Sequence, residues 1–250
     1  MQFEWINFYS EFATKLLEFK NNRAELITDI QSAYSAINMK LPKLEREDLI
    51  IDIDPFTVFG LFNKGITNAN RIAILESFAT VFNIKSKVPN NFDGIPVLNN
   101  LKATYYGFKD DRQAADIDNL WGLYESAINL AEKDDASNRE IFTKWYDTVH
   151  DQLGIRWNIT MGLYWIRPYE FINLDSINRG FIVDPDNMPV DFVNSVKKKL
   201  NKVPYASEYL AIKDACMHAL KEGNYEYKIF QNCHIEHGLY RNKLIKKKLR

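Results

Sequence analysis

Two cysteines and three of the four histidines lie within 22 residues, close to the basic end of the chain. Thiolate sulfur and imidazole nitrogen are the atoms with which zinc builds tetrahedral sites. Their spacing matches neither paired CxxC motifs nor a zinc-finger pattern, so a half-buried cysteine with surface histidines is the alternative. The sequence leaves metal binding open for Cys216, His218, Cys233, His234 and His237, and we predict no metal and no other cofactor.

Pairs of aspartates also occur, and two neighbouring carboxylates can hold a divalent metal or serve as acid and base. In a helix-rich chain such pairs are more often helix caps and solvated loop charges. The chain contains no phosphate-binding loop, dinucleotide loop, serine elbow, HExxH pair or EF-hand loop. We therefore predict a protein that is not an enzyme, with a metal-dependent hydrolase as an alternative carried by Asp52/Asp54, Asp110/Asp111, Asp116/Asp118 and Asp134/Asp135.

Two segments interleave cations with aromatic residues, residues 102–112 and residues 165–179. Cations neutralise phosphates and aromatic faces stack on exposed bases, so the combination suits nucleic acid. The alternative is that the rings belong to the core and the arginines stack on them inside the fold. The candidate DNA contacts are Lys64, Lys102, Lys109, Arg112, Arg167 and Arg179, with Tyr105, Tyr106 and Trp165 as stacking groups.

Charge is distributed unevenly along the chain, although the formal net charge is only −1. Residues 190–250 carry 13 Lys/Arg against 6 Asp/Glu, which leaves 19 against 27 in residues 1–189. Such asymmetry is typical of a basic surface that meets a polyanion, or of a solvated helical face. If the candidate cations form one face, DNA binding is favoured. If they scatter into internal ion pairs, a protein-docking function is favoured.

The elements that must position these residues are mostly helical. Apolar residues recur at three- and four-residue steps over residues 5–38, which predicts one long amphipathic helix. Further helices are expected after Asp54, from Thr67 or Asn68 to Phe82, and over 116–130, 137–154, 190–200 and 207–220. Ser137 is the expected cap of the helix that begins there.

Two segments between the helices follow other patterns. Residues 85–100 combine loop chemistry with interleaved apolar residues, which predicts an ordered loop pinned to the core. Residues 101–108 suit either a short strand or a helical turn. The fold is thus predicted to be mainly α, an α+β arrangement with few short strands. Pro185 and Pro189 mark a boundary between a main domain, 1–184, and a smaller basic helical segment, 185–250.

Features of the whole sequence predict a cytoplasmic protein. Two cysteines suit a reducing compartment, and the first residues lack the basic region and apolar run of a secretory signal. No apolar stretch approaches the ~20 residues that a membrane span requires.

Several long segments resemble the N-terminal regions of McrB-like AAA ATPase/GTPase proteins of modification-dependent restriction systems. The resemblance covers roughly residues 4–182. It is carried by EWINFYSEFATKLLEFKNNRAELI (4–27), DIDPFTVFGLFNKGITNANRIAIL (52–75), FDGIPVLNNLKATYYGFKDDR (92–112), DIDNLW (116–121) and WNITMGLYWIRPYEFINLDSINRGFI (157–182).

In that family the N-terminal region precedes a nucleotide-hydrolysing motor and commonly recognises DNA, sometimes by flipping a modified base. The resemblance implies a DNA-binding specificity module of a restriction or anti-phage defence system that reads modified cytosine. Its implied partners are DNA and a motor domain or nuclease subunit of the same system, and no membrane. This chain contains no nucleotide-binding loop, so no GTPase activity is implied. The alternative is a protein-interaction module that docks on defence-complex subunits or on a phage protein.

Overall fold

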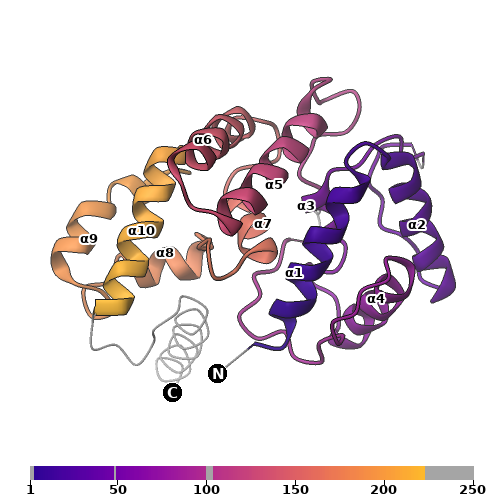
Figure 1. Cartoon of the computed structure of the whole chain (residues 1–250), viewed down its shortest axis with the longest axis horizontal. Coiled ribbons are helices and arrows are strands. Elements are labelled where there is room, and N and C mark those ends of the chain that lie inside the picture. Colours follow the sequence, from indigo (N-terminus) through magenta and orange to yellow (C-terminus); the bar gives the residue numbers. More distant parts are fainter. Residues whose placement is uncertain (1–2, 48, 100–103, 223–250) are drawn as a thin grey trace, which may run out of the picture.

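The fold is built almost entirely from helices, which confirms the mainly α prediction. The computed structural model describes residues 3–47, 49–99 and 104–222 (Figure 1). The only β feature in these ranges is an isolated bridge between Lys64 and Leu98. The helices are α1 (Trp5–Leu16), η1 (Leu17–Phe19), α2 (Arg23–Ala36), α3 (Pro55–Gly60), α4 (Asn68–Val81), α5 (Asp116–Glu132), α6 (Ala136–His150), α7 (Asn158–Ile166), α8 (Ser176–Ile182), α9 (Val190–Val196), η2 (Lys199–Asn201) and α10 (Ala206–Glu222).

The prediction of one continuous helix over residues 5–38 is wrong. The chain turns after η1 and restarts at Arg23, so that α1 packs against α7 whereas α2 packs against α4. The apolar stripe continues through the turn because both helices bury their apolar side in the same core. Periodicity reports which side is buried, but it does not report a change of direction between two turns of helix.

Local capping chemistry explains where several helices begin. The Asp54 carboxylate accepts hydrogen bonds from the backbone N–H groups of Phe56 (2.8 Å) and Thr57 (3.0 Å) at the start of α3. The Thr67 hydroxyl caps α4, as its sequence position predicts. The cap of α6 is Asp135 rather than Ser137, so the cap lies two residues earlier than the capping-box pattern suggests.

Asp116, the first residue of α5, also departs from its expected capping role. Its carboxylate accepts from the backbone N–H of Gln113 at 3.0 Å, and the N-cap position is occupied by Ala115, whose side chain makes no capping bond. The carboxylate therefore stabilises the turn that enters the helix.

Aromatic side chains fill the core between α1, α3 and α4. The ring of Phe12 lies with its centroid 5.3–5.9 Å from those of Phe59, Phe62, Phe78 and Phe82. These tilted and edge-to-face contacts are the geometries that aromatic quadrupoles favour. These aromatic side chains therefore serve to pack the core.

The loops between the core helices are also held in place. In residues 85–99, Phe92, Ile95 and Leu98 are buried, and the Leu98 N–H donates to the Asn63 carbonyl at 2.8 Å. This confirms the ordered loop that the interleaved apolar residues predict. Residues 104–108 form neither a strand nor a helix, and residues 101–103 lie outside the described ranges.

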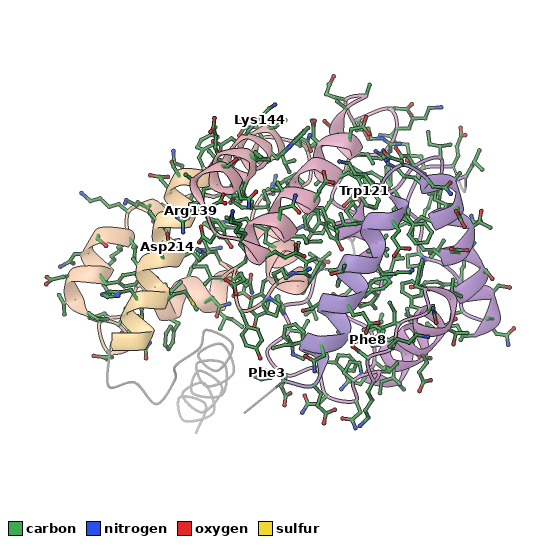
Figure 2. The ribbon with its side chains drawn as sticks, in the orientation of Figure 1. Phe3, Phe8, Trp121, Arg139, Lys144 and Asp214 are labelled. Atoms are coloured by element: carbon green, nitrogen blue, oxygen red, sulfur yellow. The ribbon has the colours of Figure 1, made fainter. Side chains whose placement is uncertain are left out.

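The helices are arranged around one continuous apolar cluster that runs from Phe3 to Ala219. In Figure 1, α1–α4 lie on one side, α5 and α7 in the middle, and α8–α10 on the other side. Figure 2 shows the contrast between Phe8 and Trp121, which are fully buried, and Lys144, which points outward from α6. Among the described residues, no helix is both long and apolar enough to cross a membrane.

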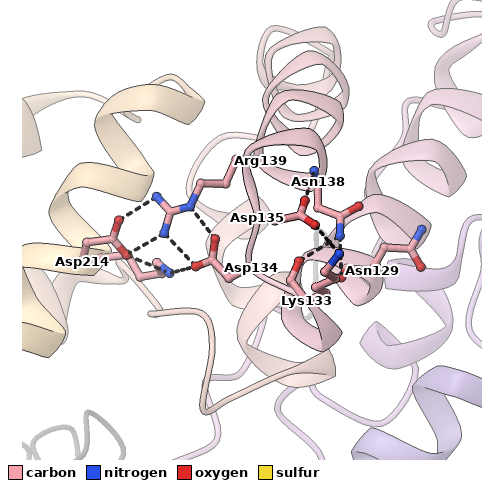
Figure 3. Close-up of polar contacts among 8 residues, drawn as sticks. Asn129, Lys133, Asp134, Asp135, Asn138, Arg139 and Asp214 are labelled. Atoms are coloured by element: carbon pink, nitrogen blue, oxygen red, sulfur yellow. Dashed lines mark hydrogen bonds and ion pairs between the residues drawn. The ribbon is translucent and has the colours of Figure 1, made fainter.

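Polar contacts tie α10 to the rest of the molecule. Arg139 at the start of α6 bridges Asp134 (2.7 Å from Nη2) and Asp214 (2.8 Å from Nη1) of α10, while Lys213 lies 2.9 Å from Asp214 (Figure 3). The Tyr209 hydroxyl donates to the carbonyl of residue 172 at 2.9 Å. Residues on both sides of residue 184 pack into the same apolar cluster. The predicted division of the chain at this residue stays a prediction.

Replacing Gly122 with alanine is expected to lower the free energy of unfolding by about 1–2 kcal/mol. A Cβ at this position of α5 would lie 2.6–2.7 Å from three indole atoms of Trp145, so α5 and α6 would have to separate. The strain of overpacking exceeds the gain of about 1 kcal/mol in helix propensity. Denaturant unfolding measures the change. In a Trp145→Ala background the same substitution should cost less, and an equal cost in both backgrounds would contradict this close contact.

Candidate functional site

An open pocket lies where the loop that precedes α5 meets the turn between α6 and α7. Its volume is about 470 Å³, larger than the volume of a single nucleobase, and its lining combines aromatic, cationic and polar side chains. The lining residues are Thr104, Tyr106, Gly107, Phe108, Asp111, Leu153, Gly154, Arg156, Trp157 and Asn158.

One wall of the pocket is held by a buried ion pair. Glu45 and Arg112 contact each other through side chains that are only 4% and 8% exposed. The second Glu45 oxygen accepts from the Lys109 backbone N–H at 3.0 Å, and Arg112 donates to the Gly107 carbonyl at 3.3 Å. The Arg112 guanidinium also lies 4.9 Å from the centre of the Tyr106 ring. Glu45 thus organises the whole loop from a position far away in the sequence.

The other wall contains a residue with an unfavourable backbone conformation, Arg156, and an aromatic ring that contacts an arginine, Trp157. Arg156 has a positive φ of 45°, which is costly for a residue with a side chain, and Gly154 has a φ of 98°. The Arg156 side chain is exposed, and no ion pair joins it to a carboxylate among the described residues. The next residue, Trp157, is half-buried, with the Arg179 guanidinium 3.7 Å from its ring centre. Burial lowers the pKa of Arg179 from its ordinary value.

The arginines predicted to contact DNA are instead occupied inside the molecule. Arg112 pairs with Glu45, and Arg179 stacks on Trp157 and donates to the Leu174 carbonyl at 2.7 Å. Arg167 donates to the Ser10 carbonyl (3.2 Å) and to the Thr14 hydroxyl (2.9 Å), which fastens α7 to α1. All three guanidinium groups therefore make contacts within the molecule, and the expectation that they grip phosphates stays a prediction.

The predicted lysines have different surroundings. Lys64 is half-buried, and burial lowers its pKa from the ordinary value. Lys109 is exposed beside the pocket, with its backbone bonded to Glu45. Lys102 lies outside the described residues. Of the six predicted cations, Lys109 is the one whose described side chain is freely exposed to solvent.

The predicted stacking groups are largely core residues. Tyr105 and Trp165 are 1% and 0% exposed, and their polar atoms donate to the carbonyls of Asn158 (2.9 Å) and Pro96 (2.9 Å). Neither ring can stack on a base without opening the core. Tyr106 is also buried, but it lines the pocket, and its hydroxyl has no hydrogen-bond partner among the described residues. Of the three predicted stacking groups, Tyr106 alone is among the residues that line the pocket, and base stacking stays a prediction.

Over residues 5–233 the chain matches the family described as Domain of unknown function (DUF8425). The chain belongs to this family. No curated protein and no solved structure shows significant similarity to it. The match extends past residue 184, so the helices after the predicted boundary are part of the family's common region.

The aspartate pairs do not form a metal centre within the described ranges, where no group of three or more histidine, cysteine or acidic side chains gathers. Cys216 is buried in α10 while His218 is exposed, and Cys233, His234 and His237 lie outside the described residues. Asp54 is fully buried as the cap of α3, and burial raises its pKa from 3.8 to about 6. Its second oxygen has no hydrogen-bond partner among the described residues.

Three aromatic or cationic lining residues were not among the predicted contacts, namely Phe108, Arg156 and Trp157, although Phe108 lies within the segment 102–112. Two signals were present in the sequence. Gly154 lies two residues before the Arg156–Trp157 pair. Trp157 is also the residue that directly precedes the apolar helix α7. Neither signal is specific, because a tryptophan at the start of a buried helix is usually part of the core.

Proposed function

We propose that this chain is a DNA-binding specificity module in which the pocket between residues 104–111 and 153–158 receives a single base. The observation that supports this is the combination in one open pocket of the half-buried Trp157 with the exposed cation of Arg156. An aromatic face contributes about 1–3 kcal/mol when a base stacks on it. An adjacent guanidinium contacts the phosphate of the same nucleotide.

This binding mode differs from the broad cationic face that the sequence suggested. The pocket is large enough for a base, and the polar side chains of Thr104 and Asn158 are among its lining residues. Of the three rings that line it, Tyr106 lies against the guanidinium of Arg112 and Trp157 lies against that of Arg179. A cation on one face holds a ring in place and leaves the stacking geometry preorganised.

The biological setting of the proposal comes from the resemblance to McrB-like N-terminal regions. We propose that the module reads modified cytosine in a restriction or anti-phage defence system and works with a motor or nuclease subunit. The pocket supports recognition of a base in general. The choice of modified cytosine depends on the resemblance alone.

A second candidate function is docking on a protein partner, and one observation favours it. Arg112, Arg167 and Arg179 are occupied internally, which leaves few cations to neutralise phosphates around the pocket. The exposed Leu153 at the rim of the pocket, 58% exposed, would suit an apolar side chain of a partner.

Binding to short duplexes tests the proposal. The purified chain is titrated with duplexes that contain cytosine or 5-methylcytosine, at low and moderate salt. Trp157→Ala is expected to weaken binding roughly 10-fold, the equivalent of about 1.4 kcal/mol. Arg156→Gln should weaken it as well, while leaving the fold intact because this side chain is exposed.

The matched control for charge is Lys144→Gln, which removes an exposed cation from the outer side of α6 (Figure 2). It should leave the affinity unchanged. Absence of duplex binding by the unmodified chain at low salt, where phosphate contacts are strongest, would overturn the DNA proposal and favour protein docking.

A further inference from the structure

Four lysines lie within the six residues that run from the C-cap of α9 to the C-cap of η2, and together they are called the lysine face: Lys197, Lys198, Lys199 and Lys202. All four side chains are exposed. Among the described residues none of them forms an ion pair with a carboxylate, although other cations in the same part of the chain do. Lys213 of α10, for example, lies 2.9 Å from Asp214.

The orientation of the lysine face is fixed by apolar anchors on the same segment. Val193, Val196 and Leu200 are buried at steps of three and four residues, which places the lysines on the solvent side. Half-buried Phe192 also packs against the core. The lysines are therefore presented by an ordered, packed segment.

Four like charges so close together repel one another. The Debye length is about 10 Å, so salt at physiological concentration screens the repulsion between neighbouring charges only in part. No carboxylate in the described part of the chain forms an ion pair with these lysines, although such ion pairs would remove the repulsion. Such an arrangement is favourable when an external polyanion supplies the opposite charge.

We infer that the lysine face binds the phosphodiester backbone of nucleic acid without base specificity. The inference rests on the proposed function in one respect, that DNA is the polyanion. It adds a second contact region, on α9 and η2, to the single base held in the pocket. A nucleic-acid backbone fits better than a lipid surface because the apolar residues of α9 face the core. An amphipathic membrane-binding helix would present those residues to lipid.

The test compares two variants with the same change of charge. In one, the four lysines of the lysine face are replaced by glutamine. In the control, glutamine replaces four other exposed lysines that form no ion pair among the described residues: Lys40, Lys43, Lys85 and Lys87. Duplex affinity is measured across a series of salt concentrations for both variants and for the unmodified chain.

The lysine-face variant is expected to bind duplex at least 10-fold more weakly at low salt. The slope of log affinity against log salt should fall in magnitude by up to about 3.6, since each of the four lost phosphate contacts removes about 0.9. The control should change the slope by less than about 1. Trp157→Ala should keep the slope of the unmodified chain, because it removes stacking and no charge.

The other outcomes identify which statement fails. If the unmodified chain binds duplex and the lysine-face variant keeps its salt slope, the inference is overturned and the proposed function stands. If the unmodified chain binds no duplex, both are overturned. If it binds vesicles containing phosphatidylserine through these lysines but not duplex, the face is a lipid contact and the inference is overturned.

Discussion

Replacing Arg112 with methionine is expected to lower the free energy of unfolding by about 3–5 kcal/mol. The substitution keeps much of the side-chain volume but leaves the Glu45 carboxylate buried, at 4% exposure, without its cation. Only the hydrogen bond from the Lys109 backbone would remain to stabilise that charge. Denaturant unfolding at neutral pH measures the loss.

Two further variants separate the ion pair from its surroundings. Adding Glu45→Gln to Arg112→Met should recover part of the stability, since the amide retains an acceptor for Lys109 and carries no charge. Arg46→Met is the matched control, because its ion pair with Asp111 is solvent-exposed and such pairs contribute little to stability. If Arg112→Met lowered the free energy of unfolding as little as Arg46→Met does, the Glu45–Arg112 pair would not be what stabilises the pocket wall.

Replacing Asp54 with asparagine is expected to raise the free energy of unfolding at pH 7.5 by about 1–3 kcal/mol. Burial raises the pKa of Asp54 from 3.8 to about 6. Between these two pH values the folded chain keeps a proton on Asp54 that the unfolded chain has lost. The contribution of Asp54 to stability is thus present below pH 3.8 and is lost as pH rises through about 6. Asparagine imitates the protonated form, and its oxygen can still cap α3.

The measurement is the pH dependence of unfolding for both proteins. The difference in stability between Asp54→Asn and the unmodified chain should grow from pH 4 to pH 7 and then level off. Asp186→Asn, at an exposed position, serves as the control and should show no such dependence. A constant difference across this range would contradict a raised Asp54 pKa.

Much of the local structure of this protein follows from the sequence. The helical period over 116–130 predicts α5, whose observed end lies two residues further on. The capping chemistry of Asp54 and Thr67 correctly predicts where α3 and α4 begin. These predictions succeed because the hydrogen bonds and apolar faces concerned involve residues a few positions apart. The break between α1 and α2 was missed, because both helices continue one apolar stripe.

The sequence also located the neighbourhood of the candidate site. The segment 102–112 was singled out for its mixture of cations and rings, and its described part lines one wall of the pocket. Which of its groups faces solvent was not predictable from composition. Tyr105 and Tyr106 are adjacent and both buried, yet only Tyr106 also lines the pocket.

Only the tertiary structure decided which cations are available to a ligand. Arg112 is paired with a glutamate 67 positions away, and Arg167 with the hydroxyl of a residue 153 positions away. Arg156, with no such partner among the described residues, is exposed at the pocket. Residue types and spacing determine local helices and caps, because those interactions are short in sequence. The charge that a surface presents depends on long-range pairing, which forms only when distant helices pack together.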